Sequence, residues 1–238
     1  MRLTLIDRPS PNHGPRRRGA SVDMLVLHYT GMKTLEAALD RLCDPKAAVG
    51  AHYLVARDGR IFRLAPENRR AWHAGVSCWG GERDVNGRSI GIELENPGHQ
   101  FGYRPFPAKQ IRALIALARG ILKRHGIARH RVLGHSDVAP RRKIDPGEKF
   151  PWRALAGSGV GYWPVSKRTN AAPDTAAVQR ALAAYGYEIA ATGKIDAQTR
   201  AVVAAFQRHF RPRRVDGKID AATAALAEAL TRAPRQPT

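Results

Sequence analysis

Cysteine, acidic residues and long apolar runs are all scarce in this sequence. The two cysteines, Cys43 and Cys78, are too few for a disulfide framework or a zinc-finger spacing, so both are expected to be reduced and unligated. No apolar run approaches the ~20 residues that cross a bilayer, and the first residues lack the apolar core of a secretory signal. We expect a cytoplasmic protein without a membrane span, or a periplasmic or cell-wall protein if export is non-standard or the start site is wrong.

Acidic residues are half as numerous as basic ones. The chain has 40 Lys and Arg against 20 Asp and Glu, and its net charge is +20. Residues 1–173 hold 30 of the basic residues. This excess indicates a polyanionic partner, either nucleic acid or peptidoglycan, whose stem peptides carry carboxylates; the alternative is a surface of solvated arginines. Nucleic acid is disfavoured because the arginines are scattered, aromatic residues make up only 7% and no nucleic-acid motif is present.

Apolar periodicity predicts an α/β fold with a mixed central β-sheet flanked by helices. The alternation of period two and the short apolar runs predict strands, and the spacing of three and four predicts helices. The expected strands are residues 22–27, 51–56, 60–64, 89–95 and 131–133, and the expected helices are 34–43 and 109–125. The turn Asp58-Gly59 joins the second and third strands into a hairpin. Strands interleaved with helices are typical of a sheet covered on its faces.

A second, smaller domain is expected after a change of composition. Residues 1–165 form the first domain, residues 166–173 a linker rich in small and helix-breaking residues, and residues 174–238 a small helical domain. The last part contains a repeat, Gly193–Ala197 and Gly217–Ala221, both reading GKIDA. In each copy a glycine turn leads to an aspartate N-cap and an apolar helix, so three short helices are predicted.

Three polar residues at separate places indicate hydrolytic chemistry. His28 ends a buried apolar run, and His135 and Asp145 lie in the loop-like stretch GHSDVAPRRKIDPG. Taken singly, a core histidine and a capping aspartate are the simpler interpretations. Together, two imidazoles and a carboxylate form a three-ligand set that leaves zinc one open position for water. The sequence therefore favours a metal-dependent hydrolase.

Other residues near these motifs have two interpretations each. Lys143 could stabilise an oxyanion beside the metal, or be one more solvated lysine. Glu93 and Glu95 share a strand face, so either could act as general base. The alternation of side chains along the strand does not distinguish between them. Trp72 could line a sugar site or plug the end of the sheet, and His73 could hydrogen-bond substrate.

Five segments in order resemble a known family. VLHYTGM, AHYLVARDGRI, RAWHAGVS, SIGIELEN and GHSDVAPRRKIDPG are similar to the motifs of zinc-dependent N-acetylmuramoyl-L-alanine amidases, relatives of the animal peptidoglycan recognition proteins. The match covers residues 10–163. By this resemblance His28, His135 and Asp145 are the ligands of one zinc ion per chain. Recognition-only members of the family lose a ligand, so the complete set favours an active enzyme over a non-catalytic protein that binds peptidoglycan fragments.

The resemblance also implies roles for the remaining candidates. Glu93 matches the catalytic acid/base, which settles the choice that alternation leaves open, and Lys143 matches the lysine that assists at the scissile carbonyl. Trp72, His73 and Asn86 match positions near the substrate groove.

The C-terminal repeat resembles the three-helix peptidoglycan-binding domain over residues 175–230. The activity expected of the whole chain is hydrolysis of the amide between N-acetylmuramic acid and L-alanine, in peptidoglycan or muropeptides. The protein is expected to be a monomer and to bind no nucleic acid.

Overall fold

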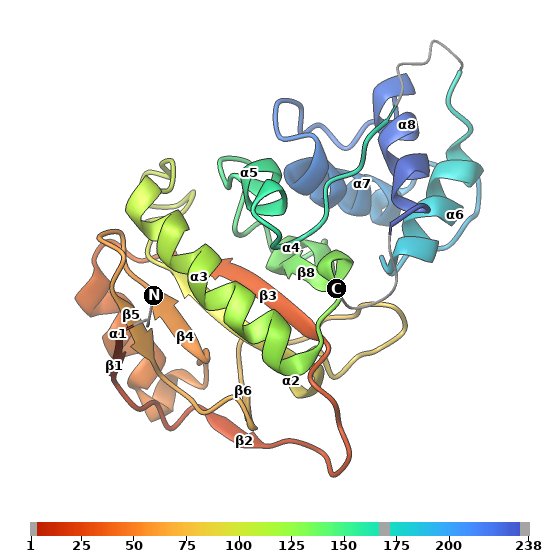
Figure 1. The fold of residues 1–238 in the computed structure, drawn as a ribbon. Coiled ribbons are helices and arrows are strands. Elements are labelled where there is room, and N and C mark those ends of the chain that lie inside the picture. The colour runs from red at the N-terminus through yellow and green to blue at the C-terminus, as the bar shows by residue number, and fades with distance from the viewer. Residues whose placement is uncertain (1–3, 167–171, 234–238) are drawn as a thin grey trace.

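The computed structural model describes residues 4–166 and 172–233. Most of the predicted linker, 166–173, therefore lies outside the described residues. Figure 1 shows a sheet with helices over it, followed by a group of helices at the C-terminal end of the chain. Within the described residues, no helix is long and apolar enough to span a membrane.

A six-stranded sheet forms the centre of the larger unit. Its strand order is β1 (Leu5–Asp7), β5 (Ile61–Arg63), β4 (Tyr53–Val55), β7 (Ser89–Leu94), β3 (Met24–Tyr29) and β8 (Val132–Gly134). The four strands β4, β7, β3 and β8 run parallel, so their carboxyl ends meet at one edge. The predicted hairpin is confirmed as the antiparallel pair β4–β5. A separate antiparallel pair joins β2 (His13–Pro15) to β6 (Arg69–Ala71).

Five helices and two short 3-10 turns complete the larger unit. They are α1 (Leu35–Cys43), η1 (Pro45–Ala47), α2 (Val85–Arg88), α3 (Ala108–His125), η2 (Arg129–Arg131), α4 (His135–Val138) and α5 (Trp152–Gly157). Both long helices are capped: the Thr34 side chain accepts a hydrogen bond from the Ala37 amide at the start of α1, and Gly126 ends α3 with φ at 63°. The left-handed conformation at that C-cap explains why glycine follows the helix.

The two faces of the sheet are covered in different ways. Helix α3 lies along one face (Figure 1) and packs Leu114 and Leu117 against Leu25 and Ile90. On the opposite face α1 covers Leu54, and the C-terminal helices reach the β3–β8 side. Because side chains alternate along a strand, His28 and Glu93 share this opposite face with Leu54, their partner in register. Helix α1 and the C-terminal helices therefore flank the carboxyl ends of β3 and β7.

The smaller unit has the three predicted helices, α6 (Thr175–Tyr185), α7 (Ala197–Phe210) and α8 (Ala221–Leu230). Their N-caps are Asp174, Asp196 and Asp220, and the last two are the aspartates that the repeat predicts. Each GKIDA loop is held by a buried glutamine from the preceding helix. Gln179 accepts from the Gly193 amide and donates to Thr199, and Gln207 accepts from the Gly217 amide and donates to the Lys218 carbonyl.

Three further expectations can be compared with the structure. The strand expected at 22–27 runs from Met24 to Tyr29, so His28 is part of it rather than its end. The stretch from His135 to Gly147 is mostly loop, but it opens with the helical turn α4. Cys43 and Cys78 are both free, as expected.

Candidate metal centre

Three side chains that are distant in sequence meet at the carboxyl edge of the sheet. His28 is on β3, His135 opens α4 directly after β8, and Asp145 follows in the next loop. Nδ1 of His28 lies 2.9 Å from Nδ1 of His135 and 3.2 Å from Oδ2 of Asp145. Nδ1 of His135 lies 3.1 Å from the same oxygen. All three side chains are buried, and their donor atoms form a nearly equilateral triangle.

The protonation of His135 follows from its other nitrogen. Nε2 lies 3.1 Å from the carbonyl oxygen of Ala74, which can only accept, so Nε2 carries the proton. Nδ1 is then an unprotonated lone pair that faces the triangle. Metal-binding histidines commonly fix their tautomer in this way, by donating the second N–H to a backbone carbonyl.

A relay of three groups sets the tautomer of His28. The Ser89 hydroxyl donates to the carbonyl of Val85 at 2.6 Å, so its oxygen is free to accept from Nε2 of His73 at 3.1 Å. Nδ1 of His73 therefore accepts, and Nε2 of His28, 3.0 Å away, donates to it. The Nδ1 lone pair of His28 is left pointing at His135 and Asp145.

These donor atoms fit a small divalent cation. Two lone pairs 2.9 Å apart with no proton between them repel, and a cation within the triangle removes that repulsion. Zinc binds imidazole nitrogen and carboxylate oxygen at about 2.0–2.1 Å, which places neighbouring ligands of a tetrahedron about 3.3 Å apart. The observed separations are close to this spacing, and three protein ligands leave one corner of a tetrahedron open.

The charge states of His28 and Asp145 suit the same ion. Burial and the neighbouring His135 ring lower the pKa of His28 to about 4, so its imidazole is neutral at pH 7. Burial alone would raise the pKa of Asp145, but the His135 and His28 rings hold the pKa of that carboxyl well below its ordinary value. The carboxylate of Asp145 and the neutral imidazole of His28 are the forms in which these residues bind metal.

Glu93 and Lys143 lie next to the triangle. Glu93 pairs in register with His28 across β3 and β7, and its Oε2 is buried without a hydrogen-bond partner among the described residues. Burial and the nearby Asp145 carboxylate raise the pKa of Glu93 to about 8, while Lys143 acts in the opposite direction. The Lys143 ammonium group thus lies within electrostatic reach of Glu93. Glu95 instead accepts from the Arg57 amide at 2.8 Å, away from the triangle.

The residues expected near the substrate groove have mainly internal contacts. His73 is 4% exposed and supports His28, and Asn86 is 6% exposed and accepts from the amides of His73 and Ala74. Trp72 is half-buried, with its indole nitrogen beside Gly14. A substrate contact by these three residues stays a prediction, whereas the support that His73 and Asn86 give to the metal-site loop is seen directly.

Comparison with known families agrees with this geometry. Residues 18–148 match the family described as N-acetylmuramoyl-L-alanine amidase, and residues 171–226 match a peptidoglycan binding domain family. The first match spans more than half of the chain.

The chain belongs to the N-acetylmuramoyl-L-alanine amidase family. It is 43% identical over 230 residues to the N-acetylmuramoyl-L-alanine amidase AmiD of Escherichia coli, covering 88% of this chain and 82% of AmiD. The predicted α/β fold and enzyme class are thereby confirmed.

Two solved structures are similar to this amidase over both units. One is E. coli AmiD in complex with the substrate anhydro-N-acetylmuramic acid-L-Ala-D-gamma-Glu-L-Lys, with a TM-score of 0.80 and 40% identity over 90% of this chain and 91% of that one. The other is AmpDh3 of Pseudomonas aeruginosa in complex with anhydromuramic pentapeptide, with a TM-score of 0.80 and 37% identity over 90% of this chain and 92% of that one.

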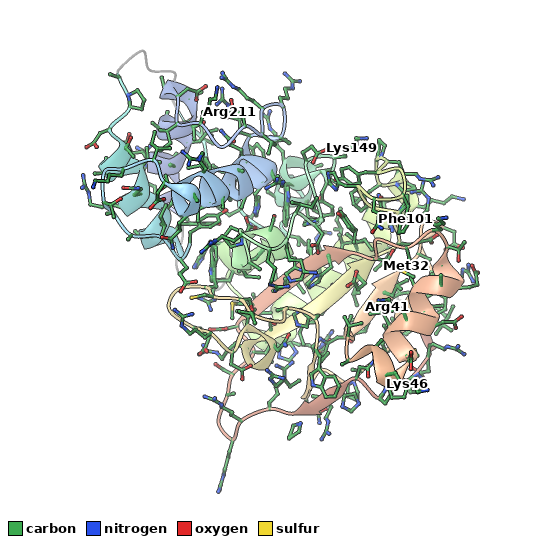
Figure 2. All side chains as sticks on the ribbon, turned by 180° about the vertical axis from the view of Figure 1, so that it is seen from behind. Met32, Arg41, Lys46, Phe101, Lys149 and Arg211 are labelled. Atoms are coloured by element: carbon green, nitrogen blue, oxygen red, sulfur yellow. The ribbon has the colours of Figure 1, made fainter. Side chains whose placement is uncertain are left out.

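An aromatic cluster beside the metal centre of this amidase was not predicted. The Tyr29 hydroxyl lies 3.0 Å from Nδ1 of His99, whose ring stacks on Tyr103 with centroids 4.2 Å apart. Phe101 and Lys149, seen from behind in Figure 2, lie on the same side of the molecule. The only sequence signal for this cluster is the position of Tyr29 directly after His28, because His99 and Tyr103 come from an irregular loop.

Proposed function

We propose that this amidase uses one zinc ion to hydrolyse the amide between the lactyl group of N-acetylmuramic acid and L-alanine. The observation that supports this proposal is the triangle of His28, His135 and Asp145. Both imidazoles direct a nitrogen lone pair toward its centre. Anhydro-muropeptides are the proposed substrate class, which is supported by the ligands of the two similar structures.

The three ligands would hold zinc through two nitrogens and one oxygen. Zinc bound there would polarise the amide carbonyl and make water a better nucleophile near neutral pH. Protein groups must then move one proton and offset the charge that develops on the carbonyl oxygen.

Glu93 is suited to the proton transfer. Its raised pKa, about 8, makes the Glu93 carboxylate a stronger proton acceptor than an ordinary carboxylate. It takes the proton from the attacking water and returns it to the alanine nitrogen as the C–N bond breaks. Its Oε2, which has no other partner among the described residues, is free for this exchange.

Lys143 is suited to the charge on the carbonyl oxygen. It is half-buried, two residues before Asp145, and its positive charge acts on both Glu93 and His28. A single well-placed donor to an oxyanion typically contributes about 3 kcal/mol to the transition state.

The rim offers contacts for the rest of a muropeptide. The Tyr29–His99–Tyr103 cluster presents aromatic surface of the kind that packs on a sugar ring. Lys149, above the Tyr103 ring at 5.1 Å, adds positive charge for a stem-peptide carboxylate.

The test is product analysis with a matched pair of variants. Purified zinc-loaded protein is incubated with soluble anhydro-muropeptides and with intact sacculi, and mass spectrometry identifies any peptide that begins with L-alanine. Glu93→Gln should lower kcat by about 10²–10⁴-fold, the typical share of a general acid/base, while Glu95→Gln should keep near wild-type kcat. Binding of muropeptide with no peptide released by the wild type would instead identify a recognition protein.

A further inference from the structure

We propose that the helical unit positions the metal ligand His135 through a buried carboxylate, that of Asp137. This inference rests on the metal centre proposed above, and it gives the C-terminal unit a part in the metal site itself.

Asp137 joins the two units within the turn that carries His135. It is 1% exposed, and its Oδ2 accepts from the Gly134 amide at 2.7 Å, which closes the first turn of α4. The other two donors belong to the helical unit. Nδ1 of His209 lies 2.7 Å from Oδ2, and the Tyr187 hydroxyl lies 2.7 Å from Oδ1. The carboxylate is therefore satisfied only when the helical unit is docked.

His209 is held so that it can serve this one partner. Its ring is 2% exposed and lies stacked on Trp152 at 3.7 Å and on Phe210 at 3.9 Å between centroids. Its Nε2 has no hydrogen-bond partner among the described residues, so Nδ1 carries the proton and donates it to Asp137. The orientation of the His209 ring is therefore fixed by this one hydrogen bond and by the two stacking contacts.

Trp152 connects the stack to the backbone before His135. A Cβ at Gly134 would lie 3.2 Å from the Trp152 ring and 2.9 Å from Cδ of Pro146, the residue after Asp145. Gly134, directly before the ligand His135, is thus packed between Trp152 and the loop that carries the ligand Asp145. Tyr187 is likewise fixed, since its ring packs edge-on against Trp79 at 4.9 Å.

Loss of either donor should loosen α4 and thereby weaken the metal site. Groups that orient metal ligands typically change metal affinity by about 10–100-fold when removed. Asp137 acts through the turn rather than on the ligand ring, so we expect the lower end of this range for His209→Leu and a few-fold change for Tyr187→Phe. His209→Asn keeps a donor near the position of Nδ1 and should restore part of the affinity.

The experiment is a zinc titration of the full-length protein against a chromophoric chelator, without substrate. Val203→Ala is the control, because Val203 is fully buried on the same helix α7 and its side chain cannot hydrogen-bond to Asp137. It should lower the melting temperature but leave the zinc dissociation constant unchanged. Tyr187→Phe removes only one oxygen, so it provides the test even if His209→Leu does not fold.

The proposal is supported if His209→Leu and Tyr187→Phe weaken zinc binding while Val203→Ala does not. It is overturned if folded Tyr187→Phe and His209→Leu bind zinc as tightly as the wild type, or if Val203→Ala weakens zinc binding equally. Muropeptide hydrolysis by the wild type is measured separately. A chain that binds zinc in this pattern but releases no peptide would overturn the proposed function and leave the positioning role standing.

Discussion

The ring of His73 decides which nitrogen of His28 faces the metal site, although the sequence suggests a substrate contact for it. Its packing explains the difference. The ring lies directly on Gly91 of β7, where a Cβ would come within 2.4 Å of Cγ of His73. A glycine in the centre of a buried strand is therefore required for close approach, and no local pattern around residue 73 reveals this cross-strand contact.

Gly91→Ala tests this packing. The added methyl group must displace the His73 ring, which breaks its hydrogen bond to His28. We expect a loss of about 1–3 kcal/mol in the free energy of unfolding, as for other overpacked cores, and weaker zinc binding by titration. Gly157→Ala is the control, since a Cβ there meets no atom within 4 Å. Unchanged zinc affinity in Gly91→Ala would show that His73 does not orient His28.

Glu93 should make the metal-free protein less stable as the pH rises. Its pKa is raised from 4.5 to about 8 because the folded protein buries it beside Asp145. A carboxyl group with a raised folded-state pKa stabilises the fold most below its unfolded pKa, and this contribution is lost as the pH rises toward 8. The wild type should lose stability relative to Glu93→Gln between about pH 5 and 8, as measured by chemical denaturation in the presence of a chelator. Parallel stability curves for the two proteins would contradict the raised pKa.

Elements were predicted more fully than contacts between them. The apolar spacing of α3 and the aspartate caps of α7 and α8 are local signals, and the structure confirms them. The GKIDA repeat likewise predicted two equivalent loops, but not the glutamines that hold them. Gln179 and Gln207 lie on the preceding helices, and their burial depends on how each loop folds back.

Gln207→Leu tests whether these loops depend on the glutamine. The substitution leaves the amides of Asp216 and Gly217 and the carbonyl of Lys218 without their partner. Since a buried unsatisfied group costs about 1–3 kcal/mol, we expect a loss of a few kcal/mol by denaturant unfolding. Gln198→Leu, on a more exposed position of the same helix, should change stability little. A mild effect of Gln207→Leu would mean that water replaces the side chain.

At the scale of the whole molecule, the metal site could be predicted from the sequence only with the family motifs. His28 lies on β3, His135 opens α4 directly after β8, and Asp145 lies in the following loop, so the parallel pairing of β3 with β8 is needed to bring them together. The interpretation of the arginines as solvated also fails for Arg16. Arg16 donates to the carbonyls of Glu67, Asn86 and Ser89 in the interior, whereas its neighbours Arg17 and Arg18 are exposed, and nothing in a run of three arginines distinguishes them. The cytoplasmic location and the monomeric state stay predictions.

The net charge of +20 should appear in the kinetics. Positive surface attracts the carboxylates of the stem peptide over a distance that salt shortens to about 8 Å at physiological ionic strength. We expect KM for muropeptide to rise several-fold between low and high salt, with kcat nearly constant. A substrate whose peptide carboxylates are amidated is the control and should show little dependence on salt. Equal salt dependence for both substrates would assign the effect to something other than charge attraction.

The interior contact of Asp137 with His209 and Tyr187 has a mechanical consequence. Because a buried charged group would lose its partners, rotation of one unit against the other is costly, and we expect the two units to move together. A glycan strand gripped by the C-terminal helices would then reach the catalytic edge at a set distance and angle. The stem peptides removed along such a strand would then be spaced by the geometry of the protein rather than by the reach of a flexible tether.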